Sequence, residues 1–112
     1  MSKRRADGRV AGAALLFAAL GDETRLTLLD RLSRAGPASI STLSETFDVS
    51  RQAVTKHLNV LSNAGVIYGR RDGREHVWAM NPSSLIEAKR HLDTIARGWD
   101  DALARLKRHL EG

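Results

Sequence analysis

The stretch from Ser39 to Met80 limits the possible folds more than any other part of the chain. It contains two short helical patterns, a two-residue connection between them, and a hairpin signal directly after the second pattern. In the first pattern Ser39 stands at a favoured N-cap position, and three apolar residues recur at helical spacing: Ile40, Leu43 and Phe47. A helix over residues 40–47 is too short to be stable alone, so it must pack against a neighbour.

The second helical pattern supplies that neighbour. Ser50 is placed to cap a helix over residues 51–64, and Gly65 follows where a left-handed residue ends a helix. The apolar side chains of this helix share the face that can pack against the first one: Val54, Leu58 and Leu61. We therefore predict two packed helices joined by the tight connection Asp48-Val49.

Two short runs of β-prone residues follow Gly65, at residues 66–70 and 74–80. Arg71-Asp72-Gly73 joins them, and an Asp-Gly pair between two such runs is a strong signal for a hairpin turn. The sequence therefore predicts a two-stranded antiparallel ribbon directly after the paired helices.

Three longer helices are expected around this unit. Residues 9–20 form a run rich in Ala and Leu, and residues 23–33 form a helix that Asp22 caps and Gly36-Pro37 ends. In the second of these helices the apolar residues at helical spacing are Leu26, Leu29 and Leu32. After the hairpin, Asn81-Pro82 opens a long helix that we expect to run to Leu110, since proline is tolerated in a first turn.

The predicted fold class is mainly α with a two-stranded β-wing. The order of helix, helix, short helix, helix, hairpin and long C-terminal helix is that of a winged helix-turn-helix. Because 112 residues suffice for one domain, we expect a single domain over residues 9–112, preceded by a disordered basic tail over residues 1–8. Aromatic residues make up only 4% of the chain, so its core must consist mainly of aliphatic side chains.

The N-terminal region also has the outline of a signal peptide, because Lys3, Arg4 and Arg5 precede an uncharged run over residues 10–21. An amphipathic first helix with a basic tail is the interpretation we favour, since the run continues directly into the helix capped by Asp22. The chain has no cysteine, which excludes disulfides, thiolate metal sites and cysteine nucleophiles. No run approaches the ~20 apolar residues of a membrane span, and we expect a cytoplasmic protein.

Positive charge is concentrated in one part of the chain. The segment from Arg51 to Arg74 holds five cationic side chains and one acid, which carry +4 of the net charge of +5. Polar groups also line the side of helix 51–64 away from its apolar residues, and an α-helix fits the major groove of B-DNA. We therefore expect double-stranded DNA as the partner, contacted by Ser50, Arg51, Gln52, Thr55, Lys56, His57, Asn59, Arg70, Arg71 and Arg74.

Within this set we expect different roles. Recognition helices present base contacts from their N-terminal half, where Gln52, Thr55 and Lys56 stand. Arg51 is suited to phosphates, and the arginines of the hairpin are suited to phosphates or to the adjacent minor groove. His57 has two open roles, a phosphate contact or a hydrogen bond that holds the paired helices together, with a slight preference for the phosphate.

Residues 17–80 resemble the ArsR-type winged helix-turn-helix regulators. The likeness rests on three motifs in the correct order: FAALGDETRL at residues 17–26, SRQAVTKHL at residues 50–58, and RDGR at residues 71–74. The resemblance implies a repressor that binds operator DNA as a dimer, with its first and last helices, here residues 9–20 and 82–110, forming the interface.

The last helix is consistent with a dimer independently of the resemblance, because it carries one long apolar stripe that ends at Leu110. We expect part of this stripe to pack within the protomer and the rest to meet a second copy. The predicted dimer interface consists of Leu15, Leu92, Ile95, Trp99, Leu103 and Leu106.

Many members of the family sense metals, and here the chain departs from its relatives. The stretch that corresponds to the family's thiolate motif reads Ser39-Ile40-Ser41-Thr42-Leu43, which offers no soft ligand. On the last helix, four potential ligands have an order and spacing that do not match the family's second metal site: His91, Asp93, His109 and Glu111. Solvated side chains are the interpretation we favour, and a hard-metal or zinc site built from these groups stays open as the alternative. We expect no cofactor, and the sequence points to no effector.

The predicted function is that of a sequence-specific DNA-binding transcriptional regulator, a repressor acting as a homodimer on a near-palindromic operator, and not an enzyme. Two alternatives remain, a non-specific architectural DNA-binding protein and a winged helix that contacts an acidic protein. Gln52 and Thr55 favour the specific binder, because a protein that contacts only phosphates would place cations there. We expect Trp78 to pack in the core rather than stack on a base, and His76 to be an ordinary wing residue.

Overall fold

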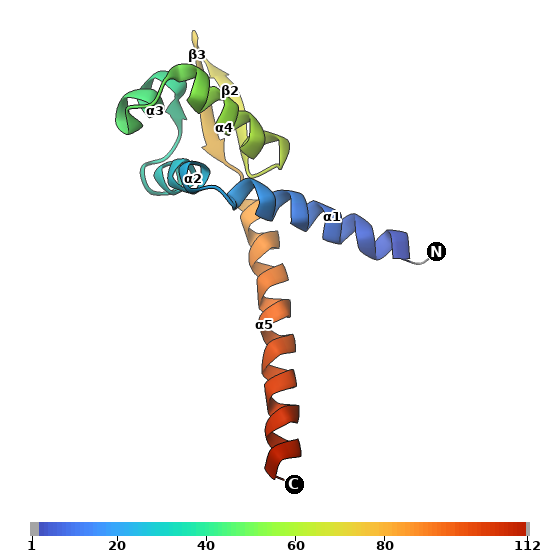
Figure 1. Ribbon diagram of the computed structural model, residues 1–112. Helices are drawn as coiled ribbons and strands as arrows, with labels where there is room; N and C mark the ends of the chain where they lie inside the picture. Colours follow the sequence, from blue (N-terminus) through green and yellow to red (C-terminus); the bar gives the residue numbers. More distant parts are fainter. Residues whose placement is uncertain (1–2, 112) are drawn as a thin grey trace.

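The computed structural model describes the backbone of residues 3–111 and the side chains of residues 11–111. The elements follow in the order α1 (Lys3–Leu20), α2 (Glu23–Ala35), β1 (Ala38–Ser39), α3 (Ile40–Phe47), α4 (Arg51–Asn63), β2 (Ile67–Asp72), β3 (Glu75–Met80) and α5 (Pro82–Glu111). Helices α2 to α4 and the sheet form a head, from which α1 and α5 extend in different directions (Figure 1). The predicted winged helix-turn-helix is confirmed.

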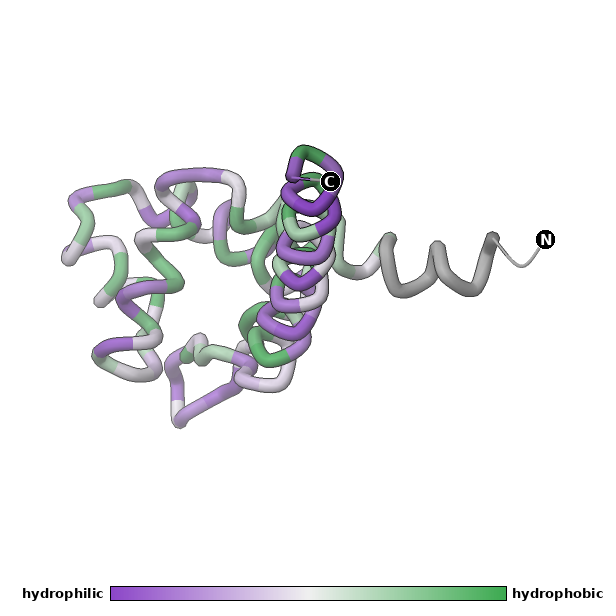
Figure 2. The backbone as a smooth tube through the Cα atoms, turned by 90° about the horizontal axis from the view of Figure 1, so that it is seen from below, coloured by the Kyte–Doolittle hydropathy of each residue, from purple (hydrophilic) through white to green (hydrophobic). Residues whose placement is uncertain are grey.

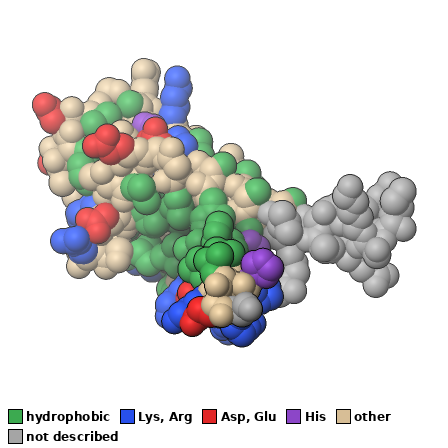
Figure 3. All heavy atoms as spheres, turned by 60° about the horizontal axis from the view of Figure 1, so that its bottom comes forward, with side chains coloured by type: hydrophobic (Ala, Val, Ile, Leu, Met, Phe, Trp, Pro, Cys, Tyr) green, Lys and Arg blue, Asp and Glu red, His purple; other side chains and the backbone are tan. Residues whose placement is uncertain are grey.

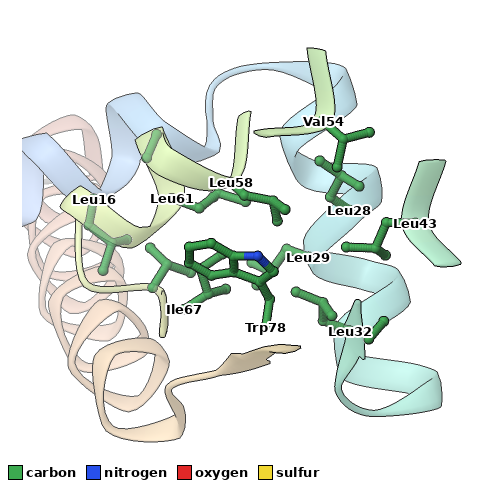
Figure 4. Packing of buried hydrophobic residues seen from close by; sticks show 13 residues of the cluster. Leu16, Leu28, Leu29, Leu32, Leu43, Val54, Leu58, Leu61, Ile67 and Trp78 are labelled. Atoms are coloured by element: carbon green, nitrogen blue, oxygen red, sulfur yellow. The ribbon is translucent and has the colours of Figure 1, made fainter. Parts of the chain in front are cut away.

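The core of the head is formed by aliphatic side chains from every helix except α5, together with one indole. Val54, Leu58 and Leu61 of α4 are almost completely buried, as their spacing predicts. Figure 4 shows them pointing toward side chains of α1, α2, α3 and the sheet. In α2 one prediction was wrong: Leu26 is 49% exposed, and Leu28 packs in the core beside Leu29 and Leu32.

Three predicted N-caps fix where the helices begin. The Oδ2 of Asp22 accepts a hydrogen bond from the backbone N–H of Arg25 at 3.0 Å. The hydroxyl oxygens of Ser39 and Ser50 accept from the third residue of their helices at 3.2 Å and 3.1 Å. Each contact satisfies a backbone donor that the first turn leaves without a partner, which explains why these residue types stand at these positions.

Arg25 ties α1 to α2. Its Nε donates to the carbonyl of Ala19 at 2.6 Å, and its Nη2 donates to the carbonyl of Ala18 at 3.3 Å. The carbonyls at the C-terminal end of a helix lack partners within the helix and carry partial negative charge, so a guanidinium stabilises them. Through Asp22 and Arg25, the chain between residues 17 and 26 therefore caps the end of one helix and the start of the next.

The sheet contains a short strand that the sequence did not predict. Its order is β1-β3-β2 with antiparallel pairing, and β1 adds the pair of Ala38 with Trp78 to the expected hairpin. Two residues are too few to show an alternating pattern. The hairpin turn also lies later than expected, at residues 73–74 rather than 71–73, because Asp72 pairs with Glu75. Gly73, the first of the two loop residues, has φ of 64°.

Helix α1 begins at Lys3, six residues before the predicted start at Arg9. Residues 3–8, which we expected to be part of a disordered tail, are therefore helical, as their content of Lys, Arg and Ala allows. Residues 1 and 2 of that expected tail lie outside the described residues. Among the residues that the structure describes, no helix is both long and apolar enough to cross a bilayer.

Helix α5 extends far beyond the head and none of its 30 residues is buried. Hydrophobic and hydrophilic residues alternate along it in the view from below (Figure 2). The radius of gyration is 18.5 Å, whereas a compact chain of this length has about 13 Å. A single protomer therefore leaves this helix without a packing partner over most of its length.

Candidate nucleic-acid interface

Helix α4 and the hairpin lie at the end of the head away from the C-terminal end of α5 (Figure 1). Val54, Leu58 and Leu61 hold α4 on the core, so the opposite face of the helix is open to solvent. Four of the side chains predicted to contact DNA lie exposed on α4: Arg51, Gln52, Lys56 and Asn59. Because α4 also contacts β2, the exposed face of the helix lies beside the base of the wing.

Hydrogen bonds at the start of α4 determine which donor and acceptor positions its hydroxyl groups have left for a ligand. The Oγ of Ser50 accepts from the N–H of Ala53, which leaves its hydroxyl hydrogen free to donate to an anion. The Oγ1 of Thr55 donates to the carbonyl of Arg51 at 2.7 Å. Thr55, which is half-buried, therefore retains only acceptor lone pairs and a methyl group, a combination suited to a base edge rather than to a phosphate.

His57 does not share the exposed face of α4. Five residues separate it from Gln52, which corresponds to about 140° around an α-helix. Its Nδ1 lies 3.8 Å from the Oδ2 of Asp22, and its side chain is 26% exposed. His57 therefore faces α2 rather than the exposed surface, and it contacts the N-cap of α2 instead of forming the expected hydrogen bond within the pair of α3 and α4.

The wing presents its cations on both faces of a two-stranded ribbon. Arg70, Arg71 and Arg74 are exposed, as are the two acids that pair beside the turn, Asp72 and Glu75. Arg70 pairs with Val77 and Arg71 with His76, so the side chains of the two arginines leave opposite faces of the ribbon. Together with Lys56 and Arg51, they give the head a cationic end.

Trp78 packs in the core, as predicted, with an exposed fraction of 6%. Its indole Nε1 is buried without a hydrogen-bond partner among the described residues. The ring cannot stack on a base without leaving the core. His76 stacks on this indole from the exposed side, a relationship that sequence reasoning missed together with its neighbour Gly69. The only signal was a glycine inside a strand, which often marks a close approach.

Within one protomer, the four potential ligands of the last helix do not come together. The described residues contain no group of three or more His, Asp and Glu side chains that could hold a metal ion. His91 is half-buried and lies against Phe17 of α1, with ring centroids 6.1 Å apart. The imidazole of His91 therefore takes part in the contact between α1 and α5.

Comparison with known proteins places this interface in a family. A helix-turn-helix domain model matches residues 20–69, which include α2, α3 and α4. The HTH-type transcriptional regulator Rv2034 of Mycobacterium tuberculosis is 36% identical over 85 residues, which are 76% of each chain. The solved structure of an ArsR-like transcriptional regulator from Rhodococcus sp. RHA1 is 39% identical, with a TM-score of 0.82 over 90% of this chain and 94% of that one.

The chain is an ArsR-type winged helix-turn-helix regulator.

Another relative is the transcriptional repressor SdpR of Bacillus subtilis, 33% identical over 62% of this chain and 77% of its own. As an ArsR-type transcriptional regulator with a helix-turn-helix DNA-binding domain, the protein has α4 as its recognition helix and the β2–β3 hairpin as its wing. The likeness spans the head and most of the flanking helices.

Proposed function

We propose that the protein is a repressor that binds one near-palindromic operator as a homodimer in the cytoplasm. The main observation in support of the proposal is that the protomer has two exposed surfaces at its opposite ends. One is the cationic and polar surface of α4 and the wing, and the other is the apolar stripe of α5. A DNA-reading head at one end and an unpartnered helix at the other are what a two-fold symmetric DNA-binding dimer requires.

The apolar stripe of α5 supports the second copy. Its large side chains are between 46% and 76% exposed: Leu92, Ile95, Trp99, Leu103, Leu106 and Leu110. They repeat at a spacing of eleven residues, Leu92 with Leu103 and Ile95 with Leu106, so the stripe stays on one face of a nearly straight helix. Figure 3 shows hydrophobic side chains gathered over this part of the molecule.

The middle of the stripe combines small residues with one large indole. Ile95, Gly98, Trp99 and Ala102 line a shallow open depression in which the small residues flank the indole. Leu15 of α1, the remaining predicted interface residue, is 55% exposed. We propose that α1 and α5 of two protomers pack together and bury these side chains, which a monomer leaves in water.

The exposed surface of α4 supports sequence-specific binding. Gln52 and Lys56 are free to form bidentate or charged hydrogen bonds with base edges in the major groove. Thr55 offers an acceptor and a methyl group beside them. We propose that Ser50, Arg51, Asn59 and the three wing arginines hold the phosphates on either side, while His57 positions α4 through Asp22.

In the dimer, the two recognition helices would enter successive major grooves about 34–36 Å apart. Occupancy of such a site beside a promoter would block transcription initiation, in keeping with the name of the related repressor SdpR. The five cations of α4 and the wing in each protomer set the expected salt dependence, since each neutralised phosphate adds about −0.9 to the log–log slope.

The test is a titration of purified protein onto the intergenic DNA upstream of its own gene, with scrambled DNA as competitor, at several salt concentrations. Saturation at two protomers per site, resistance to competitor and a steep salt slope are expected. Steep salt dependence without sequence preference would identify an architectural DNA-binding protein instead. Absence of binding at every salt concentration would leave the winged helix as a protein-contact module.

A further inference from the structure

The imidazole of His76 lies flat on the indole of Trp78. The ring centroids are 4.7 Å apart and the ring planes meet at 23°. Trp78 belongs to the core of the head, whereas His76 is exposed on the wing. The stack therefore connects the projecting part of the hairpin to a side chain that the core holds in place.

Gly69 makes the room for this stack. Gly69 pairs with Trp78 and Arg71 pairs with His76, so alternation places all four on one face of the ribbon. A Cβ at Gly69 would overlap the Nε2 of His76 and lie 3.1 Å from its Cδ2. The backbone does not need glycine here, because the positive φ angles of this hairpin are confined to Gly73. The glycine is required for the ring that passes over it.

The stack lies where the wing leaves the head. Beyond it, every residue from Arg70 to Glu75 is exposed, and this tip carries the three wing arginines. A two-stranded ribbon is only marginally stable by itself. Its direction relative to α4 therefore depends on the contacts at its base, and the His76–Trp78 stack is the last of these before the tip.

We propose that His76 is the positioning residue of the wing. Held in the gap at Gly69 and stacked on Trp78, it fixes the direction of the ribbon so that Arg70, Arg71 and Arg74 meet DNA phosphates together with α4. This inference rests on the proposed function, in which the wing contacts DNA. A pre-ordered wing loses less conformational freedom on binding than a mobile one, so the stack raises affinity without itself touching the DNA.

The test compares the salt slope and the operator affinity of wing variants. His76→Ala removes the stack, and we expect about tenfold weaker binding with a shallower slope, by about 0.9 for each arginine–phosphate contact that is lost. His76→Phe keeps a ring on Trp78 without a polar atom, and we expect it to restore both values. A role in stability alone would lower the urea midpoint and leave the salt slope at the wild-type value.

Gly69→Ala provides an independent test of the same stack. The methyl group would push the imidazole off Trp78 while the extended backbone tolerates alanine, so we expect the same loss as in His76→Ala. In the double variant the methyl group meets no ring, and the two losses should not add. Additive losses would overturn the proposal, and so would a His76→Ala protein with wild-type slope and affinity or a His76→Phe protein that fails to recover.

If the wing does not contact DNA, as the proposed function requires, a different variant would reveal it. Replacing Arg70, Arg71 and Arg74 by alanine must reduce the salt slope if the wing contacts DNA at all. An unchanged slope in that variant would remove the wing from the DNA interface. A reduced slope there, combined with a wild-type slope in His76→Ala, would refute only the positioning role of His76.

Discussion

The Nδ1 of His57 lies 3.8 Å from the Oδ2 of Asp22, and this contact joins the recognition helix to the N-cap of α2. The ion pairs between fully charged side chains among the described residues, Arg34 with Asp30 and Arg90 with Glu87, lie within single helices. The same carboxylate oxygen accepts the N–H of Arg25, whose guanidinium caps α1. Polar contacts at Asp22 therefore connect α1, α2 and α4 where the rest of their packing is apolar.

The first prediction concerns pH. The backbone hydrogen bond from Arg25 lowers the pKa of Asp22, and the charges of Arg25 and His57 lower it further. The unfolded chain then binds a proton more readily than the folded one, so the carboxylate stabilises the fold above its ordinary pKa and this stabilisation is lost as the pH falls through the lowered value. We expect urea midpoints of the wild type to fall more steeply on acidification below about pH 4 than those of Asp22→Asn, which keeps a capping oxygen. Parallel curves would contradict this assignment.

Much of the head could be predicted from the sequence because its signals are local. Val54, Leu58 and Leu61 repeat on one helical face, and all three are buried. The N-caps Ser39 and Ser50 could be predicted because each contact joins a side-chain oxygen to a backbone N–H only three residues later. The concentration of cations between residues 51 and 74 likewise predicted which surface would be exposed and basic.

The remaining features depend on contacts between elements that sequence spacing does not encode. Leu26 and Leu28 are equally apolar, and the packing of α2 against the other helices and the sheet decides that Leu28 is buried. The position of His57 against Asp22 depends on how α4 crosses α2. The fit of His76 over Gly69 depends on strand register, which a shift of one residue would abolish.

A second prediction tests the end of the recognition helix. Gly65 has φ of 78°, a conformation that costs a residue with a side chain roughly 1–2 kcal/mol. Gly65→Ala should therefore lower the free energy of unfolding by about that amount in urea titrations. The control is Gly12→Ala, which lies within α1 with open space around it and should raise stability by about 0.5–1 kcal/mol. An unchanged or raised free energy of unfolding in Gly65→Ala would show that the turn tolerates a side chain.

A third prediction concerns the reading surface of α4. Replacing Gln52 and Lys56 by alanine should weaken operator binding by about 1–3 kcal/mol for each bidentate base contact that is lost. Both side chains are exposed, so the urea midpoint should stay at the wild-type value. Asn63→Ala, an exposed substitution at the C-terminal end of the same helix, is the matched control and should bind like the wild type. Operator affinity that survives the double substitution would assign base reading to other residues.

The last prediction concerns the dimer. Trp99 is 66% exposed in the protomer and lies at the centre of the apolar stripe of α5. Trp99→Glu would bury a charge without a partner in the proposed interface, so we expect monomers in sedimentation equilibrium and weak binding to a full operator. Thr94→Glu adds the same charge about 140° around the helix and should leave the dimer intact. A Trp99→Glu protein that still sediments as a dimer would place the interface elsewhere, whereas dissociation of both variants would mean that added negative charge anywhere on α5, rather than burial at Trp99, opposes association.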